Sequence, residues 1–494
     1  MLLEADALAP YPAEPRISAS DVASAVARSG RVLVVLDDDP TGTQSVADLP
    51  VLTSWDVDDF RWAFSAEPAG GRASAVYVLT NTRSLDPDEA ARRNRDVVRA
   101  ALEAGAGTGT EVAFVSRSDS TLRGHFPLET DVIAEALAEH GAADGGPSAI
   151  DGIVIVPAFP DAGRVTIGGE HYMRSTGPDG AAALVRVSET EFARDATFGF
   201  STSYLPDYIE EKSGGRLAAA GVIVLDLSTV RAGSEAIADA ITPAESLTPI
   251  VADIVSEADF RALALGLEAA EARGKTLLYR VGPPFVRGRI GQEIREPLTA
   301  DEIFRGETPA RDDASAGGLI VVGSHVGLTT RQLARLTEQH ASSHIVELDV
   351  ARLLDPAQAE AYLEARVAEV ASALADRDVI VHTSRTLVRS DSPAESLEIA
   401  RAVSAAVVRL VSRVLATTPP RFVIAKGGIT SSDVAAHGLE IRRAIVRGPM
   451  LPGIVSLWEP VDGPARGIPY VVFAGNVGDD ESLAAVTRTL SRTF

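Results

Sequence analysis

The chain has 494 residues, of which 46% are hydrophobic, 23% charged and only 5% aromatic, and its formal net charge is −23. These values predict a globular protein of two or three domains whose interior is filled by aliphatic side chains. The acidic balance argues against nucleic acid and anionic membranes as partners, because both require a basic surface. Because the chain has no cysteine, disulfides, thiolate nucleophiles and cysteine-ligated metals are excluded.

The amino-terminal segment is acidic and reaches Pro10 and Pro12 without a basic region, which is not the pattern of a signal peptide. No run of about 18 uncharged apolar residues occurs, so the sequence predicts no transmembrane helix. We therefore expect a cytoplasmic protein.

Strands and helices alternate along the first half of the chain. Residues 88–104 have the Ala/Arg/Glu periodicity of a helix, and Asp86-Pro87-Asp88-Glu89 places acidic side chains at its start. Such alternation predicts an α/β fold with right-handed crossovers and a mainly parallel sheet. The strands expected here are residues 32–36, 76–79, 112–115, 153–156 and 222–225.

The periodic pattern fails between residues 296 and 318, where charged residues, prolines and glycines predominate. It resumes with expected strands at residues 319–322, 344–348, 379–381, 421–424 and 470–473. We therefore expect two α/β domains, each a mainly parallel sheet flanked by helices. The predicted boundaries are an N-terminal extension at residues 1–30, a first domain at 31–298, a connector at 299–317 and a second domain at 318–494.

Polar loops follow four strands of the first half, and the first loop, Asp37-Asp38-Asp39-Pro40-Thr41-Gly42, carries three carboxylates. Ligands bind at the edge of a sheet where parallel strands end, so we expect the loops to converge there. Adjacent carboxylates repel one another, which favours a bound metal, sugar hydroxyl or arginine over a turn with solvated acids. The other loops are Thr80-Asn81-Thr82-Arg83-Ser84, residues 116–125 and residues 157–164.

The loop at residues 116–125 reads Ser-Arg-Ser-Asp-Ser-Thr-Leu-Arg-Gly-His. Its hydroxyl, carboxylate and guanidinium groups suit a polyol, and Arg117 or Arg123 is a candidate for a bidentate carboxylate clamp. An ordinary loop that caps a helix at Ser120 or Thr121 explains the same residues.

Three glycine-rich turns follow strands of the second half, with the second turn expected to open a helix at Val434. Glycine lets backbone N–H groups approach phosphate oxygens, and a helix amino terminus favours negative charge. Neither the Walker A spacing nor the dinucleotide fingerprint occurs, so the turns together predict a nucleotide cradle of an uncommon kind. The turns are Gly323-Ser324-His325-Val326-Gly327, residues 426–433 and Gly475-Asn476-Val477-Gly478-Asp479.

Four of the eight histidines lie in or near these loops. Their spacing offers no metal pair, and we expect none of them to be catalytic. They are His125, His171, His325 and His382.

The motifs resemble those of the four-carbon acid sugar kinase family, ATP-dependent enzymes that phosphorylate tetronates such as threonate, erythronate or 3-oxo-tetronates. The family's Asp-Asp-x-Thr-Gly signature matches residues 38–42, and its Asp-Ser-Thr loop with a following glycine matches residues 119–124. The remaining matches are residues 157–172, Gly323-Ser324, residues 427–431, residues 448–453 and residues 475–478. The resemblance runs from about Val32 to the end. The chain departs from the family pattern at Thr43-Gln44-Ser45 and at Val326.

The resemblance implies transfer of a phosphoryl group from ATP, with Mg²⁺, to a hydroxyl of a four-carbon sugar acid, the terminal one by first expectation. It implies an active site in a cleft between the domains, where Asp39, with Asp38 beside it, orients or deprotonates the hydroxyl. Arg83 and Arg123 are then candidates for the substrate carboxylate, and Asp119 joins Asp39 as a candidate for its hydroxyls. The expected substrate-binding residues are Asp38, Asp39, Asn81, Arg83, Asp119, Ser120, Thr121, Arg123 and Arg164. The expected ATP-binding residues are Ser324, Gly427, Gly428, Ile429, Thr430, Gly475, Asn476 and Gly478.

The sequence identifies neither the metal ligands nor the oligomeric state, and a homodimer is one expectation. One alternative function is a haloacid-dehalogenase-like phosphatase with Asp37 as nucleophile, since Asp37, Asp39 and Thr41 fit the Asp-x-Asp-x-Thr motif. That class also needs a lysine and a further acidic pair, and Gly42 stands where an apolar residue usually follows. A second alternative is a non-catalytic sensor of sugar acids or nucleotides.

Overall fold

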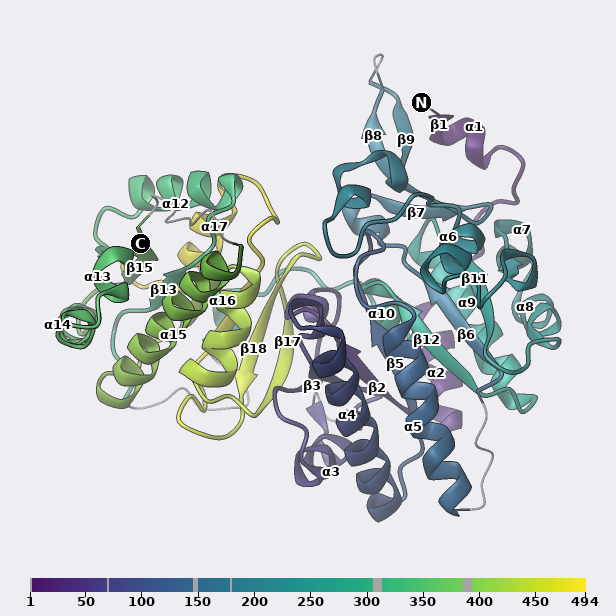
Figure 1. Cartoon of the computed structure of the whole chain (residues 1–494), viewed down its shortest axis with the longest axis horizontal. Coiled ribbons are helices and arrows are strands. Elements are labelled where there is room, and N and C mark those ends of the chain that lie inside the picture. Colours follow the sequence, from purple (N-terminus) through teal and green to yellow (C-terminus); the bar gives the residue numbers. More distant parts are fainter. Residues whose placement is uncertain (1, 69–70, 145–149, 178–179, 305–312, 385–392) are drawn as a thin grey trace. The chain divides into compact units, whose positions relative to one another are not determined.

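A computed structural model describes residues 2–68, 71–144, 150–177, 180–304, 313–384 and 393–494. The chain forms two compact units (Figure 1). Unit 1 comprises Met1–Gly42 and Trp55–Ile294, and unit 2 comprises Thr43–Ser54 and Arg295–Phe494. Part of the predicted connector, residues 305–312, lies outside the described residues. No described helix is long and apolar enough to cross a membrane.

Unit 1 is built on a parallel sheet with strand order β10-β11-β6-β12-β5-β2-β4. Its central strands are aliphatic and buried along their length, as expected for a parallel sheet covered on both faces. The predicted strands are confirmed, whereas β11 and β12 were missed. The strands are β2 (Val32–Asp37), β4 (Ala75–Leu79), β5 (Val112–Arg117), β6 (Gly152–Val156), β10 (Ile223–Leu225), β11 (Thr248–Ala252) and β12 (Leu277–Val281).

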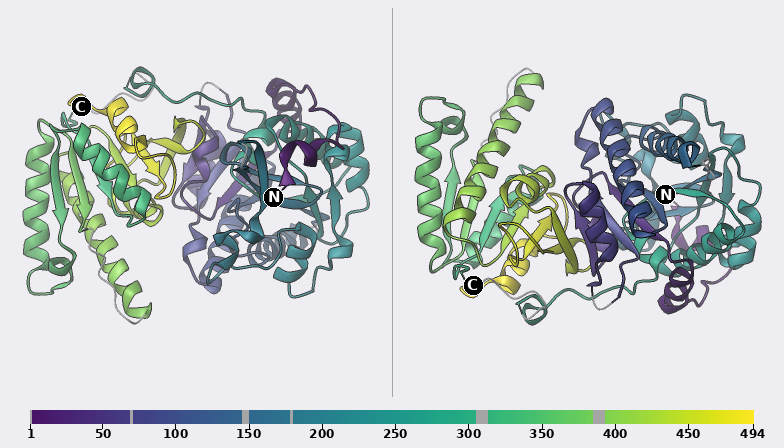
Figure 2. Two further views of the ribbon diagram at one scale, coloured as in Figure 1. Left: turned by 90° about the horizontal axis from the view of Figure 1, so that it is seen from above. Right: turned by 90° about the horizontal axis from the view of Figure 1, so that it is seen from below.

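Helices cover both faces of this sheet, with α4 and α5 on one face and α2 on the other (Figure 2). Both ends of helix α4 (Pro87–Thr108) are set by local sequence signals. Asp86 caps its first turn, and Gly109 ends it in the left-handed conformation. The other helices of unit 1 are α1 (Glu4–Leu8), α2 (Ala19–Ser29), α3 (Val57–Ser65), α5 (Leu128–Asp144), α6 (Leu205–Lys212), α7 (Leu227–Arg231), α8 (Ser234–Ile241), α9 (Glu257–Ala272) and α10 (Pro284–Ile290).

A small antiparallel sheet follows β6 and was not predicted. It consists of β7 (Arg164–Ile167), β8 (Glu170–Thr176), β9 (Ala182–Arg186) and the short amino-terminal strand β1 (Leu2–Leu3), in the order β1-β9-β8-β7. The amino-terminal extension is therefore part of unit 1, because β1 pairs with β9 and α2 packs against α9.

Unit 2 has a mixed sheet with the order β3-β17-β18-β19-β16-β13-β15-β14. The strands from β19 to β14 are parallel to one another, whereas the pairings β3–β17, β17–β18 and β18–β19 are antiparallel. The strands are β3 (Leu49–Leu52), β13 (Leu319–Val322), β14 (His344–Leu348), β15 (Val379–Thr383), β16 (Val423–Lys426), β17 (Arg443–Leu451), β18 (Val455–Pro460) and β19 (Tyr470–Phe473).

Strand β3 changes the domain division expected from the sequence. Residues 43–54 fall inside the first predicted domain, yet β3 pairs with β17 and its segment belongs to unit 2. The Thr43 hydroxyl also lies 2.8 Å from the Ser456 hydroxyl and accepts a hydrogen bond from the Trp458 indole at 2.9 Å. The chain thus enters unit 2 directly after the Asp-Asp-Pro-Thr-Gly segment and returns at Trp55.

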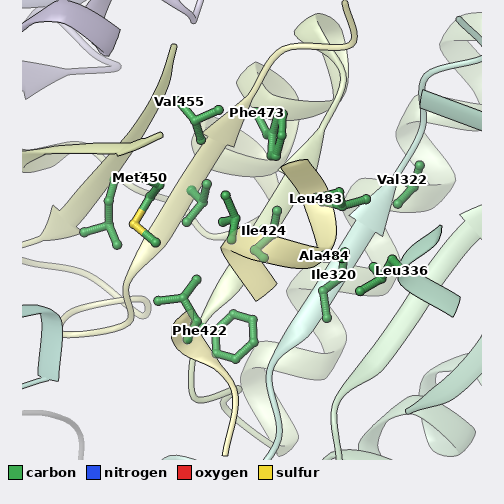
Figure 3. Packing of buried hydrophobic residues seen from close by; sticks show 14 of the residues in the cluster. Ile320, Val322, Leu336, Phe422, Ile424, Met450, Val455, Phe473, Leu483 and Ala484 are labelled. Atoms are coloured by element: carbon green, nitrogen blue, oxygen red, sulfur yellow. The ribbon is translucent and has the colours of Figure 1, made fainter. Parts of the chain in front are cut away.

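One hydrophobic core of unit 2 lies between its sheet and the helices α12 and α17. Ile320, Ile424 and Phe473, from three adjacent parallel strands, pack with Leu483 and Ala484 of α17 (Figure 3). This packing holds the three strands side by side, so that the turns at their carboxyl ends come together. The helices are α11 (Ala300–Phe304), α12 (Gly327–Gln339), α13 (Val350–Leu354), α14 (Ala359–Leu374), α15 (Pro393–Thr417), α16 (Gly428–Asp433) and α17 (Ser482–Leu490).

Candidate functional site

The four polar loops predicted to converge in unit 1 do so at the carboxyl edge of its sheet. They follow β2, β4, β5 and β6, and β5, β2 and β4 are direct neighbours. Strand β12, which was not predicted from the sequence, lies between β5 and β6 and adds Arg280 to this edge. We call this cluster of loops the acidic rim.

Asp37 and Arg117 lie beneath the acidic rim, not on it. Their side chains are 3% and 2% exposed and form an ion pair. The Arg117 guanidinium also donates a hydrogen bond to the backbone carbonyl of Asp39. Arg117, one of the two predicted carboxylate clamps, therefore holds the aspartate loop in place.

Asp38 is also held within the protein. Arg83 donates to both of its carboxylate oxygens, at 3.0 and 2.6 Å, and Arg117 lies 3.6 Å away. Burial raises the pKa of the Asp38 carboxyl above its usual value, and the charge of Arg83 opposes that rise. Asp38, predicted to be catalytic and substrate-binding, is buried and holds Arg83 in place.

Asp39 is the most accessible of the three aspartates, with 24% of its side chain exposed. The backbone N–H of Thr41 donates to Asp39 Oδ1 at 2.9 Å, and the Thr41 hydroxyl donates to the same oxygen. Asp39 Oδ2 lies 3.6 Å from the Arg83 guanidinium. Asp39 therefore keeps a fixed orientation and has one carboxylate oxygen that faces a positive charge.

The loop after β5 is ordered by its own side chains. Arg123 donates to Asp119 at 2.7 Å, and the Thr121 hydroxyl donates to the same carboxylate. Burial acts to raise the pKa of Asp119, but Arg83, Arg123 and these hydrogen bonds outweigh it and lower the pKa to about 2. Asp119 is therefore ionised at neutral pH. Ser120 and Thr121, predicted to bind substrate, are themselves buried.

Gly124 is the position in this loop that requires glycine. Its φ of +122° is rarely adopted by other residues, and an added Cβ would lie 2.8 Å from the Arg280 guanidinium and 3.2 Å from Asp38 Oδ2. Arg280 in turn donates to Glu129 and to the Ser116 hydroxyl. Because Arg280 and Glu129 lie outside the predicted loops, no sequence pattern indicated their place under the acidic rim.

The two remaining predicted residues of unit 1 also lie at the acidic rim. Asn81 follows β4 and adopts the left-handed conformation, with φ of 52°. Arg164 begins β7, and its backbone exchanges hydrogen bonds with Phe159 in the loop after β6. The structure thus brings the predicted substrate residues of unit 1 to one edge of its sheet, although several of them bind one another.

The three glycine-rich turns of unit 2 meet at the carboxyl ends of β13, β16 and β19, which are adjacent in the sheet. A Cβ added at Gly427 would lie 3.1 Å from the Thr430 hydroxyl and 3.2 Å from the Ser324 Cβ, and Gly427 has φ of +130°. A Cβ added at Gly475 would lie 2.7 Å from the Ser324 hydroxyl. We call these three turns the glycine cradle.

The second turn of the glycine cradle differs from the prediction in one respect. Helix α16 begins at Gly428, not at Val434, because β16 extends to Lys426 and Gly427 alone makes the turn. A Cβ added at Gly428 would meet no atom within 4 Å, and Ile429 is 60% exposed. The side-chain positions of both residues therefore face open space.

Side chains of α12 hold the third turn in place by donating hydrogen bonds to its backbone carbonyls. The Thr329 hydroxyl donates to the Gly475 carbonyl at 2.8 Å, and Gln332 donates to the Val477 carbonyl at 3.0 Å. Asn476 and Gly478 are exposed on this turn.

Lys426, at the end of β16, is fully buried beneath the glycine cradle. Its ammonium group lies 3.9 Å from the ring centroid of Phe473 and donates to the Ala474 carbonyl. Burial lowers the pKa of Lys426 to about 7. This hydrogen bond joins the second and third turns of the cradle.

No group of three His, Cys, Asp or Glu side chains suited to a metal ion occurs in the described part of the chain. The histidines near the loops have structural partners. His171 contacts the Ser120 carbonyl at 2.8 Å, and His125 contacts the Thr82 carbonyl at 3.1 Å.

Comparison with known proteins shows the class to which these two units belong. A family model described as a sugar-binding N-terminal domain matches residues 33–289, and one described as a nucleotide-binding C-terminal domain matches residues 319–483. The acidic rim lies within the first match and the glycine cradle within the second. The fold and the two sites thus define a protein with one sugar-binding and one nucleotide-binding domain.

Full-length relatives identify the family. The chain is 24% identical over 471 residues to a D-erythronate kinase of Heliobacterium modesticaldum, covering 91% of this chain and 95% of that protein. It is 29% identical over 438 residues to a D-threonate kinase of Cupriavidus necator, covering 85% and 89%. The chain belongs to the four-carbon acid sugar kinase family.

Solved structures support the fold. A crystal structure of a Salmonella typhimurium LT2 protein, 20% identical, matches with a TM-score of 0.65 and covers 93% of this chain and 99% of that chain. A Haemophilus influenzae protein, 17% identical, matches with a TM-score of 0.60 and covers 92% and 99%.

Proposed function

We propose that the protein is an ATP-dependent kinase that phosphorylates a hydroxyl group, by first expectation the terminal one, of a four-carbon sugar acid. The observation that carries this proposal is the presence of both family domains in one chain, with the acidic rim in one and the glycine cradle in the other. The named relatives are kinases of four-carbon sugar acids and align over most of the chain.

In unit 1, Asp39 is the residue that would act on the attacking hydroxyl. Phosphoryl transfer depends mainly on positioning and charge neutralisation, so a single oriented carboxylate suffices to align and deprotonate the hydroxyl. Asp39 has that orientation through Thr41, whereas Asp37 and Asp38 are buried against arginines. Asp38 supports the reaction indirectly, because it fixes Arg83 next to Asp39.

In unit 2, the glycine cradle would hold the nucleotide. The turns place backbone N–H groups at the amino termini of α12 and α16, which suits phosphate oxygens. Ser324 and Thr430 would donate hydroxyl hydrogen bonds to phosphate or ribose. The exposed apolar side chains of Val326 and Ile429 would contact the base.

Magnesium would accompany ATP. Mg²⁺ in kinases is held largely by nucleotide phosphates and by one or two carboxylates, so the lack of a metal cluster among the described side chains is compatible with its use. When bound, the ion would neutralise charge on the transferred phosphoryl group. The location of the active site in a cleft between the domains stays a prediction, as does the formation of a homodimer.

The phosphatase alternative is not favoured by the geometry. A phosphatase of that class needs Asp37 as an accessible nucleophile, and Asp37 is 3% exposed and paired with Arg117. The sensor alternative differs in turnover, not in geometry, and is tested by the same experiment.

The experiment is an ADP-release screen with ATP, Mg²⁺ and a panel of four-carbon sugar acids, including their 2-oxo and 3-oxo forms. We expect ADP release that depends on one or a few of these acids, with a phosphorylated acid as product. Ligand binding without turnover would favour the sensor. Hydrolysis of phosphate esters without ATP would favour the phosphatase, and either result would overturn the proposed function.

A further inference from the structure

Most guanidinium groups at the acidic rim or directly beneath it already have carboxylate partners. Arg83 binds Asp38, Arg117 binds Asp37 and Arg280 binds Glu129. Arg123 binds Asp119 at 2.7 Å, lies 3.7 Å from Asp195 and covers the ring of Phe192. A substrate carboxylate could engage these arginines only by displacing an internal partner.

Arg164 is different. Its guanidinium forms no hydrogen bond or ion pair with any described residue, and its Nε atom is buried without an acceptor. Burial lowers the pKa of Arg164, and the charged groups that act on it are Asp119 and Arg123, from the loop after β5. The positive charge of Arg164 in turn contributes to the lowered pKa of His171, which is mainly due to burial.

The backbone around Arg164 is firmly placed. Its N–H and carbonyl are both bonded to Phe159, at 2.9 and 2.8 Å. Two strand positions away, Thr166 bonds to His171, whose ring contacts the Ser120 carbonyl. These bonds join β7 to the loop after β5, so the guanidinium of Arg164 is held close to the acidic rim.

A partly buried cation without a direct partner is unfavourable, and such an arrangement is typical of a binding site whose ligand supplies the missing charge. Guanidinium binds carboxylate through two parallel hydrogen bonds, which a phosphate-binding backbone or a lysine does not reproduce. We infer that Arg164 is the residue that binds the substrate carboxylate, and that Arg83 and Arg123 instead shape the acidic rim. The inference rests on the proposed function, because it names the group of the sugar acid that Arg164 recognises.

The test compares Arg164→Met and Arg164→Lys with the wild type, using D-erythronate and D-threonate as acids and erythritol and D-threitol as neutral counterparts. The control is Arg174→Met on the neighbouring strand β8, since Arg174 already has Glu4 as partner at 2.7 Å. For Arg164→Met we expect kcat/KM for the preferred acid to fall by about 30- to 1,000-fold, while the KM for ATP and the kcat/KM for the polyols stay within about twofold. Arg164→Lys keeps the positive charge but cannot form the two parallel hydrogen bonds. Its kcat/KM for the preferred acid should lie between the values of the wild type and Arg164→Met.

A second readout needs no turnover. The preferred acid should raise the melting temperature of the wild type and of Arg174→Met, and should leave that of Arg164→Met unchanged. Without ligand, Arg164→Met should melt at or above the wild-type temperature, because the substitution removes a partly buried charge that has no direct partner.

Three results would overturn the inference. They are an acid kcat/KM in Arg164→Met within about threefold of the wild type, an equal loss with acid and polyol, and an unliganded melting temperature well below wild type. The last result would show a structural role. If the wild type consumes no ATP with any acid, the proposed function fails, and the melting measurements still decide whether Arg164 binds the carboxylate.

Discussion

The buried pair of Asp37 and Arg117 allows a quantitative prediction. Arg117→Met retains much of the aliphatic volume but leaves the Asp37 carboxylate, 3% exposed, without its cation. Breaking a buried ion pair by removing one partner costs about 3–5 kcal/mol of unfolding free energy. The Asp39 carbonyl also loses one of its donors, so the aspartate loop should loosen as well.

The expected effect can be converted into a melting temperature. Unit 1 is larger than about 250 residues, a size at which 1 kcal/mol corresponds to roughly 2 °C, so its transition should fall by about 6–10 °C. Differential scanning calorimetry and urea unfolding followed by circular dichroism measure this change. The matched control is Arg99→Met, whose partner Glu139 is 57% exposed and whose loss should cost less than about 1 kcal/mol.

A double-mutant cycle with Asp37→Asn completes the test. Because the two side chains bind each other, the double variant should be more stable than the sum of the single effects predicts. If Arg117→Met lowers stability no more than Arg99→Met, the argument that the pair holds the aspartate loop is wrong.

Three further predictions concern the two sites. Asp39→Asn should lower kcat by about 10²–10⁴-fold with an unchanged circular dichroism spectrum, because the amide oxygen can still accept from Thr41; near-normal turnover would remove Asp39 as the base. Gly428→Val should leave the melting temperature unchanged and raise the KM for ATP at least about tenfold, whereas Gly221→Val, which also points into open space, should change neither; an unaffected KM would place the nucleotide elsewhere. The pKa of Lys426 is about 7 in the folded protein and 10.5 unfolded, so the unfolded state binds more protons between these values and wild-type stability should rise with pH across that window. The free energy of unfolding of Lys426→Met should therefore exceed that of the wild type most at or below pH 7, and this difference should shrink toward pH 10. A difference that stays constant with pH would contradict the lowered pKa.

Much of the fold could be predicted because its strands are aliphatic runs that end in polar turns. Such local patterns located β2, β5 and β13 and the loops after them. Strands β3 and β17 gave no comparable signal, since their pairing joins positions nearly 400 residues apart and depends on tertiary contacts.

The candidate sites show the same division between local and tertiary information. The residue types at the acidic rim were predicted, but not which of them bind each other. Asp38 and Arg83 were both assigned to the substrate, and the structure pairs them at 2.6 Å. Arg280 lies at the edge through β12, a strand whose position between β5 and β6 no sequence period reveals.

Residues 43–54 belong to unit 2 although they precede most of unit 1 in the chain, and this order has a consequence for biosynthesis. Strand β3 leaves the ribosome early but pairs with β17, whose residues are made roughly 390 positions later. At about 5–20 residues per second, β3 waits some 20–80 s for β17. An amino-terminal fragment that stops before β17 would therefore leave β3 without the partner that it has in unit 2, and a carboxyl-terminal fragment starting at Arg295 would lack β3. Separate production of the nucleotide-binding half requires grafting the Thr43–Ser54 segment onto it.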